Sequence, residues 1–472
     1  MWRFRRTTLI VVGCFSVLAG LGISRKLYFE PTWWLLVFSP ALLIFKNKNL
    51  ASLMLVVLLG ISLGLARGSI YMQKLSELKT LSGQKIVVEA IARTDAVYGK
   101  NSQLEFTASN IKQLQPRQQS LAGTFKISGF GVPMVYRGDQ VRVSGKVFPM
   151  RGSNQARMSY TQIQVIGSGS QWFDKFARTF TTGMENALPE PQASFGLGLL
   201  IGQRTNLSQD IITQLTMVGL VHIVAVSGYN LTILVRAAQR LKLQSKYQKT
   251  LLSIGLIIAF ILVTGFSASI IRAAIVSTLS LWAWYYGREI RPLLLIVFTA
   301  ALTGLFNPFY VWGDLGWYLS FLAFFGILII APLLVSRLFS RPPRLLNLVI
   351  IETLCAEVMT LPLIMMTFGQ LSLVALLANT LIVPLVPYAM LLSSLAALAG
   401  AVLPQWAGWV AWPAHMLLTY MLDVVHLLAD VPSIFLHVSI SSTVMICTYF
   451  VILVLVAISH KRIRDKKVLL EK

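Results

Sequence analysis

The chain has 472 residues, of which 56% are hydrophobic and only 12% are charged. This composition excludes a soluble globular enzyme and indicates a membrane protein with many spanning helices. Lys and Arg number 41 against 18 Asp and Glu, a net charge of +23, part of which reflects the basic bias of cytoplasmic loops. Because the three cysteines lie in apolar runs, we expect neither a disulfide framework nor a metal site; they are Cys14, Cys355 and Cys447.

Three apolar runs open the chain, at 7–23, 33–45 and 50–66. Basic residues before the first run give it the look of a signal peptide, but no A-x-A-like cleavage site follows, so we expect a retained helix. Gly60 and Gly64 form a small-xxx-small pair that predicts close packing against another helix. We therefore expect residues 1–66 to form an N-terminal three-helix membrane segment that starts in the cytoplasm.

Residues 67–168 break the apolar pattern. Charge returns, and five short runs of strand-forming residues are separated by turn residues. Such spacing predicts a small β-barrel, such as an OB-fold. The runs lie at 85–93, 102–111, 123–130, 139–148 and 158–166. Since the third apolar run exits outward, this OB-like domain is expected outside the cytoplasm.

The β domain is also basic, with 14 Lys and Arg against 5 Asp and Glu, a net charge of +9. One interpretation is a solvated face close to anionic lipid. The other is a phosphate-binding surface, in which charge and base stacking hold single-stranded nucleic acid. Candidate DNA-binding residues are Lys85, Arg93, Lys126, Arg142, Lys146, Arg151 and Arg157. Nearby aromatic residues, some of which must be core, are Tyr98, Phe106, Phe130, Tyr136 and Tyr160.

An amphipathic helix is expected at 169–187, lying on the outer membrane surface. Residues 188–460 are nearly all apolar and form the main membrane domain, followed by a basic cytoplasmic tail at 461–472. Clusters of basic residues follow odd-numbered predicted spans of this domain, as expected for loops that face the cytoplasm. The prediction is a polytopic α-helical membrane protein of about twelve spans, with the β-barrel inserted and both termini cytoplasmic. The nine later spans are expected near 212–235, 250–266, 268–286, 293–306, 316–335, 345–366, 371–402, 405–429 and 441–459, with the seventh of these broken by prolines.

Polar residues interrupt the run from 219 to 235, which is apolar enough to cross a bilayer. Such residues usually face a bundle interior or a water-filled path. Pore lining, helix–helix hydrogen bonding and a hydrolase with Ser227 as nucleophile and His222 as base are the alternatives. Because there is no G-x-S-x-G motif and no partner carboxylate, no catalytic residue is assigned. The polar positions are His222, Ser227, Gly228 and Asn230.

Arg272 lies between apolar residues on both sides, where a charged side chain costs at least about 2.5–3.5 kcal/mol on insertion. Arg272 either forms a structural salt bridge with Glu352 or Glu357, or contacts phosphate groups in a pore. Asp314 either caps the following helix or meets a cation. Asn379 precedes two prolines, where freed backbone groups need partners.

Five segments in order resemble motifs of the ComEC family, bacterial competence membrane proteins. They are LLIGQR (199–204), VHIVAVSGYN (221–230), SASIIRAAI (267–275), DLGWYLSFLA (314–323) and LANTLIVPLVP (377–387). The resemblance implies a channel that passes one DNA strand into the cytoplasm during natural transformation, with 188–460 as the channel domain. Carried over by position, the transport core is Arg204, His222, Ser227, Gly228, Arg272, Asp314 and Ser320, to which we add the intramembrane polar residues Asn230, Glu357 and Asn379.

The chain departs from the family in three places. Gln203 stands where the family often has an acidic residue, and Asn230 where many members have histidine, which leaves a metal or proton role doubtful. Many relatives continue into a metallo-β-lactamase-like nuclease domain, but no H-x-H-x-D-H occurs here. We expect a short form without that domain.

No Walker A motif occurs either, so we expect no enzyme and no cofactor. The resemblance implies, as partners, single-stranded DNA, membrane lipid, a separate cytoplasmic helicase or translocase, an outer DNA receptor and a competence pilus, in the bacterial cytoplasmic membrane. The sequence leaves open whether the protein forms a homo-oligomer. A transporter or flippase for another anionic substrate is the alternative function, and an intramembrane serine hydrolase a further one.

Overall fold

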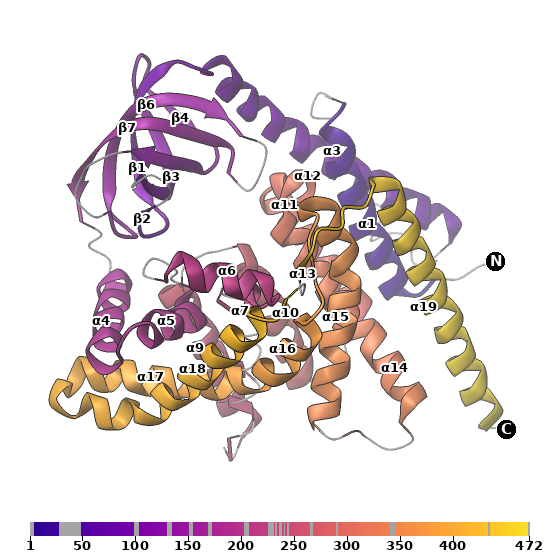
Figure 1. Ribbon diagram of the computed structural model, residues 1–472. Helices are drawn as coiled ribbons and strands as arrows, with labels where there is room; N and C mark the ends of the chain where they lie inside the picture. Colours follow the sequence, from indigo (N-terminus) through magenta and orange to yellow (C-terminus); the bar gives the residue numbers. More distant parts are fainter. Residues whose placement is uncertain are drawn as a thin grey trace. The chain divides into compact units, whose positions relative to one another are not determined.

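The computed structural model describes most of the chain (Figure 1). The described residues are 4–27, 49–98, 103–129, 135–150, 154–168, 172–202, 207–224, 245–264, 268–288, 291–339, 345–432 and 435–470, with residue 343 and a few residues between 231 and 242. Their contacts divide the chain into two units. Unit 1 comprises 1–182, 203–206 and 228–317, and unit 2 comprises 183–202, 207–227 and 318–472.

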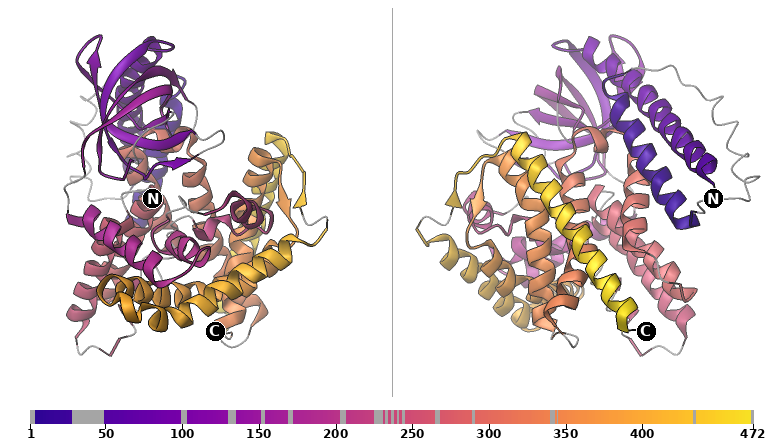
Figure 2. Two further views of the ribbon diagram at one scale, coloured as in Figure 1. Left: turned by 60° about the vertical axis from the view of Figure 1, so that its left-hand side comes forward. Right: turned by 90° about the vertical axis from the view of Figure 1, so that its right-hand side faces the viewer.

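Unit 1 begins with α1 (Arg6–Ser24) and α3 (Leu50–Thr80), which run side by side in Figures 1 and 2. Glycines allow this approach. A Cβ atom added at Gly60 would lie 2.7 Å from Ser16 Cβ, and one at Gly64 would overlap the Val17 carbonyl oxygen. The predicted small-xxx-small packing is therefore confirmed, with α1 as the partner helix. The apolar run at 33–45 lies outside the described residues.

Four further helices lie wholly in unit 1: α9 (Lys246–Thr264), α10 (Ala268–Tyr285), α11 (Pro292–Phe306) and α12 (Phe309–Gly313). The short α12 is tied to α1 by two hydrogen bonds. The Trp312 indole donates to the Leu21 carbonyl at 2.6 Å, and Arg25 donates to the Trp312 carbonyl at 2.6 Å. Arg67 of α3 donates to the Leu305 carbonyl at 2.8 Å. These bonds satisfy carbonyls at helix ends and fix the chain just before α13 (Leu315–Phe325).

The strands of unit 1 form one curved sheet. They are β1 (Lys85–Ala92), β2 (Val97–Tyr98), β3 (Leu104–Gln115), β4 (Gln119–Leu121), β5 (Phe125–Gly129), β6 (Gln140–Pro149) and β7 (Ala156–Gly167). The five longest pair in a continuous circuit: β1 with β3, β3 with β5, β5 with β7, β7 with β6, and β6 with β1. Only the β5–β7 pair is parallel among these.

Residues along β1 and β6 alternate between buried and accessible, as a sheet with one apolar face requires. Val88, Phe125 and Ile127 are fully buried in the core on that face. Phe106 is 3% exposed and belongs to this core, whereas Tyr136 and Tyr160 are 41% and 78% exposed. Among the described aromatic candidates, Tyr160 is therefore the most accessible to a ligand, and Tyr136 contacts Arg178. Phe130 and the side chain of Tyr98 lie outside the described residues.

The predicted amphipathic helix forms as α4 (Trp172–Ala187). Its Arg178 donates to Asp139 Oδ1 at 3.0 Å and lies 4.8 Å from the centre of the Tyr136 ring. Both partners precede β6, so the first part of α4 is attached to the sheet domain. Phe180 and Met184 are buried within the protein. The membrane-surface position of this helix stays a prediction.

Unit 2 is helical. Its helices are α5 (Gln192–Ile201), α6 (Gln209–Met217), α7 (Val221–Val224), α14 (Ala331–Leu338), α15 (Leu345–Phe368), α16 (Ala375–Ile382), α17 (Val386–Val402), α18 (Ala407–Ala429) and α19 (Ser442–Leu470). A π-helical turn, η3 (Gly326–Ile330), precedes α14. A two-stranded ribbon joins β8 (Leu371–Ser372) to β9 (Phe435–Leu436).

Two predicted spans of unit 2 are interrupted. The segment at 371–402 is broken, as predicted, because a 3₁₀ turn (Val383–Leu385) with Pro384 separates α16 from α17. The single helix expected at 212–235 differs: α6 ends at Met217, and Gly219 follows with φ +81°. That left-handed conformation suits glycine and stops a helix.

Within the described residues, six helices are long and apolar enough to cross a membrane. They are Arg6–Ser24, Leu50–Thr80, Leu315–Leu338, Asn347–Phe368, Ala375–Val402 and Ser442–Ser459. Gln192–Ile201 and Pro292–Phe306 are apolar but shorter. The protein is therefore mostly helical, with about six candidate spans and a small sheet domain; the predicted count of twelve is not confirmed.

Candidate transport core and nucleic-acid interface

Arg272 is the most unusual side chain of unit 1. It lies in α10 with 2% of its surface exposed, and it is among the largest fully buried side chains. One terminal nitrogen, Nη2, donates to the Gly316 carbonyl at 2.9 Å. Nε and Nη1 are buried and have no hydrogen-bond partner among the described residues. A buried guanidinium with unsatisfied donors is costly, so a bound acceptor would stabilise it.

Asp314 lies at the start of α13. Its Oδ1 accepts a hydrogen bond from the Trp317 backbone N–H at 2.8 Å, so the predicted N-cap is confirmed. Trp317 in turn donates from its indole to Thr303 Oγ1 at 3.0 Å. Asp314 also interacts electrostatically with Arg272. In the part of the chain that the structure describes, Arg272 forms no ion pair within 4.0 Å, so Asp314 balances its charge at longer range.

This arrangement suits a mobile anion. The cap fixes Asp314 on the helix N-terminus, and the Gly316 carbonyl holds one nitrogen of Arg272. The two remaining donors, Nε and Nη1, can each donate a hydrogen bond to a phosphate oxygen. The Asp314 carboxylate weakens the binding of an anion at this site, because it repels a second negative charge.

His222 lies in α7, just after the turn that separates α6 from α7. Its Nδ1 lies 3.0 Å from the Gly219 carbonyl oxygen. Since a carbonyl only accepts, Nδ1 carries the proton and Nε2 of the neutral ring is left as an acceptor. A Cβ atom added at Gly219 would lie 2.8 Å from Ala375 Cβ, which places this turn against the start of α16.

Further unsatisfied polar atoms lie on α15 and α16, which pack together in unit 2. Asn379 is 6% exposed, and its Oδ1 has no partner among the described residues. Glu357 Oε2 and Ser372 Oγ are buried without a partner in the same part of the chain. Ser320 on α13 is half-buried. Buried polar atoms of this kind in apolar helices are typical of pathways for water or polar substrates.

Four predicted core positions lie outside the described residues: Arg204, Ser227, Gly228 and Asn230. Their roles stay predictions. Of the remaining positions, Arg272 and Asp314 come together in unit 1, and His222 and Asn379 both lie in unit 2. The Gly316 carbonyl was missed by the sequence reasoning, because a backbone acceptor 44 positions away leaves no signal in the residue types.

The basic side chains of the sheet domain differ in how they are neutralised. Lys126 pairs with Glu105 and Arg142 with Glu89, both at 2.7 Å. Arg157 donates weakly to Ser128 Oγ at 3.5 Å. Arg93 is engaged within the chain, and Arg151 lies outside the described residues. Lys85 and Lys146 face each other across β1 and β6, a pairing that the sequence alone did not reveal.

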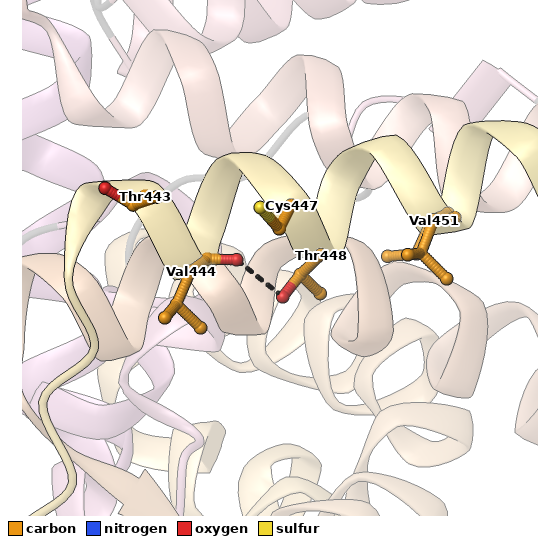
Figure 3. Close-up of a pocket in the computed structure, with 6 residues that line it drawn as sticks. Thr443, Val444, Cys447, Thr448 and Val451 are labelled. Atoms are coloured by element: carbon orange, nitrogen blue, oxygen red, sulfur yellow. Dashed lines mark hydrogen bonds between the residues drawn. The ribbon is translucent and has the colours of Figure 1, made fainter.

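A shallow hollow on α19 carries no comparable chemistry. Its lining residues all come from this helix, and Figure 3 shows them along its length. The one polar interaction drawn is internal, from Thr448 Oγ1 to the Val444 carbonyl at 2.9 Å. None of the apolar window of α19 is buried inside the protein, as expected for a helix that contacts lipid.

These features define a mostly helical membrane protein with a basic sheet domain and a buried arginine in its helical part. Residues 199–462 match the Competence protein family. Because the match covers more than half of the chain, the chain belongs to that family, and the resemblance read from the five motifs is confirmed. Arg272, Asp314, His222 and Asn379 lie within the matched residues.

The ComE operon protein 3 of Bacillus subtilis (strain 168) is 25% identical over 285 residues. The alignment covers 58% of this chain and 35% of that protein, so the chain spans about a third of its relative. No solved structure matches the chain.

Proposed function

We propose that this protein is a channel component that passes single-stranded DNA across the bacterial cytoplasmic membrane during natural transformation. Its family links it to competence, the capacity for DNA uptake. One observation carries the finer proposal: Arg272 is buried in the family-matched region with two donors that lack partners among the described residues. Phosphates of a passing strand supply the missing acceptors.

In this mechanism each phosphate accepts hydrogen bonds from Arg272, while the Gly316 carbonyl keeps the guanidinium oriented. Asp314 limits how tightly the phosphate is held, because its charge opposes the anion. Conduction needs binding that is favourable enough to enter and weak enough to leave. Within unit 2, His222 Nε2 and Asn379 Oδ1 are acceptors that suit base or water donors.

The topology belongs to the same proposal. We propose about twelve spans with both termini in the cytoplasm. The sheet domain is proposed to be an OB-like barrel outside the membrane. The circuit of pairings through β1, β3, β5, β7 and β6 supports it, since every long strand has two neighbours.

We further propose that the chain carries no catalysis of its own. A separate cytoplasmic helicase or translocase then pulls the strand, and an outer receptor with a competence pilus delivers it. Membrane lipid surrounds the helices, and homo-oligomers are compatible with this scheme. The predicted domain limits at 66, 168, 187 and 460 are proposed as the boundaries between these parts.

The test is complementation of a gene deletion with labelled marker DNA at matched protein levels. We expect uptake to be lost in the deletion and in Arg272→Ala, and partly restored in Arg272→Lys, which keeps the charge but not the fork. Arg288→Ala is the control, because Arg288 is exposed after the end of α10. Normal DNA import in the deletion strain would overturn the proposal and favour another anionic substrate.

A further inference from the structure

The outer face of β1, β6 and β7 carries basic side chains without acidic partners. Lys85 on β1 lies directly opposite Lys146 on β6, and both are exposed. Lys146 in turn lies opposite Ser159 on β7. The ion pairs at Lys126 and Arg142 do not involve either lysine. Among the described residues, this row therefore holds two adjacent positive charges with nothing negative beside them.

Like charges directly opposite each other destabilise a sheet, because Cβ atoms in such pairs lie about 5 Å apart. Neighbouring rows of the same strands avoid this: Glu89 lies opposite Arg142 and forms an ion pair with it. An unneutralised lysine pair next to the Glu89–Arg142 ion pair is typical of a surface that binds an anion, because the bound anion removes the repulsion between the two lysines.

Tyr160 adds a second, independent feature at the same end of β7. It occupies a bulge between Ser159 and Thr161, with φ +54°, and its side chain is 78% exposed. Thr161 beyond it is buried, so the bulge places Ser159 and Tyr160 on the outer face together. Phe148, two positions after Lys146 on the same face, is 42% exposed. Flat aromatic rings thus lie beside the lysines.

We propose that Lys85, Lys146, Tyr160 and Phe148 form a docking patch for single-stranded DNA, in which the lysines contact phosphates and Tyr160 stacks on a base. The proposal rests on the DNA-uptake function and names the face that engages the strand. Charge complementarity selects an anionic ligand, and the exposed rings select one with flat bases. The β3–β5 side is less suited, because Lys126 there is neutralised by Glu105.

The experiment uses the full chain in nanodiscs of zwitterionic phosphatidylcholine, with dye-labelled oligothymidine as the probe and anisotropy as the readout. We expect the double variant Lys85→Gln/Lys146→Gln to bind at least tenfold more weakly in low salt. Its log–log salt slope should fall by about 1.4, since each single-strand phosphate contact contributes about 0.7. Tyr160→Ala should weaken binding roughly tenfold, and Tyr160→Phe should retain it.

The matched control is Lys74→Gln/Arg117→Gln, which removes the same charge at exposed positions off the patch. A second readout is thermal stability: the Lys85→Gln/Lys146→Gln protein should melt higher without DNA, because the repulsion is gone. Loss of binding with unchanged or higher melting temperature supports the patch and rules out misfolding.

Three results would overturn the patch. The wild-type protein does not bind the probe, the patch variants bind the probe as tightly as the control variant does, or the patch variants lose only their binding to phosphatidylglycerol vesicles. The last result would assign the face to anionic lipid. If patch variants bind normally while the gene deletion still abolishes uptake, the patch fails and the proposed function stands. If the patch variants lose binding but deletion leaves uptake intact, the proposed function fails and the patch stands.

Discussion

The sheet domain and the family-matched helices handle positive charge in opposite ways. On the sheet, Lys126 and Arg142 are accessible and ion-paired at 2.7 Å, so water and carboxylates share their charge. In the helices, Arg272 is buried with one backbone acceptor and a longer-range carboxylate. An exposed charge is easily replaced, whereas a buried one is retained at a cost in stability. This difference supports the proposed role of Arg272 in transport.

The largest effect should come from Arg272→Met, which keeps an unbranched apolar side chain and removes the charge. We expect DNA uptake to fall at least about 100-fold, while the melting temperature stays equal or rises, because an unsatisfied buried charge is gone. Uptake of marker DNA and thermal unfolding of the purified protein measure the two quantities. A lower melting temperature with normal uptake would make Arg272 a structural residue.

An intermediate effect should come from Asp314, which caps α13 and lies near the charge of Arg272. Two substitutions distinguish these roles. Asp314→Asn keeps a good N-cap for α13 but removes the charge near Arg272, so uptake should change several-fold with little loss of stability. Asp314→Ala should lose about 1 kcal/mol of stability in addition. Chemical denaturation and uptake of the two variants side by side test this separation. Equal stability of the two would show that the cap contributes nothing.

The smallest effect should come from the Lys126–Glu105 pair of the sheet domain. Its side chains are 35% and 27% exposed, and pairs of this kind contribute about 0.2–1 kcal/mol. Replacing both by Gln should therefore leave the melting temperature and DNA binding nearly unchanged. A large loss in either measurement would mean that the two regions do not differ as described, and that the β3–β5 side also engages DNA.

Much of this architecture follows from local sequence patterns. Alternation of apolar residues places the strands within 85–167, and the apolar flanks of Arg272 predict its burial, found at 2% exposure. Gly60 and Gly64 predict a close helix contact, which α1 makes. These features depend on residues that are close in sequence, so the spacing of apolar residues and the residue types are sufficient to predict them.

The rest depends on contacts between distant residues. The Lys85–Lys146 pair requires the strand register, and the exposure of Tyr160 requires a bulge that its residue type does not signal. Gly316 and Asp314 reach Arg272 only through the packing of α10 against the start of α13. The break at Gly219 was missed because its flanks are apolar enough for one continuous helix.

The most direct test of the account is whether a strand in transit touches the Arg272 site. A photoreactive phenylalanine analogue in place of Tyr310, which interacts electrostatically with Arg272, is illuminated while labelled DNA is being taken up. The same analogue in place of Phe450, 67% exposed on α19, is the control. The account predicts DNA crosslinks at position 310 and none at 450. Active uptake with no crosslink at 310, or with equal crosslinking at both positions, would contradict it.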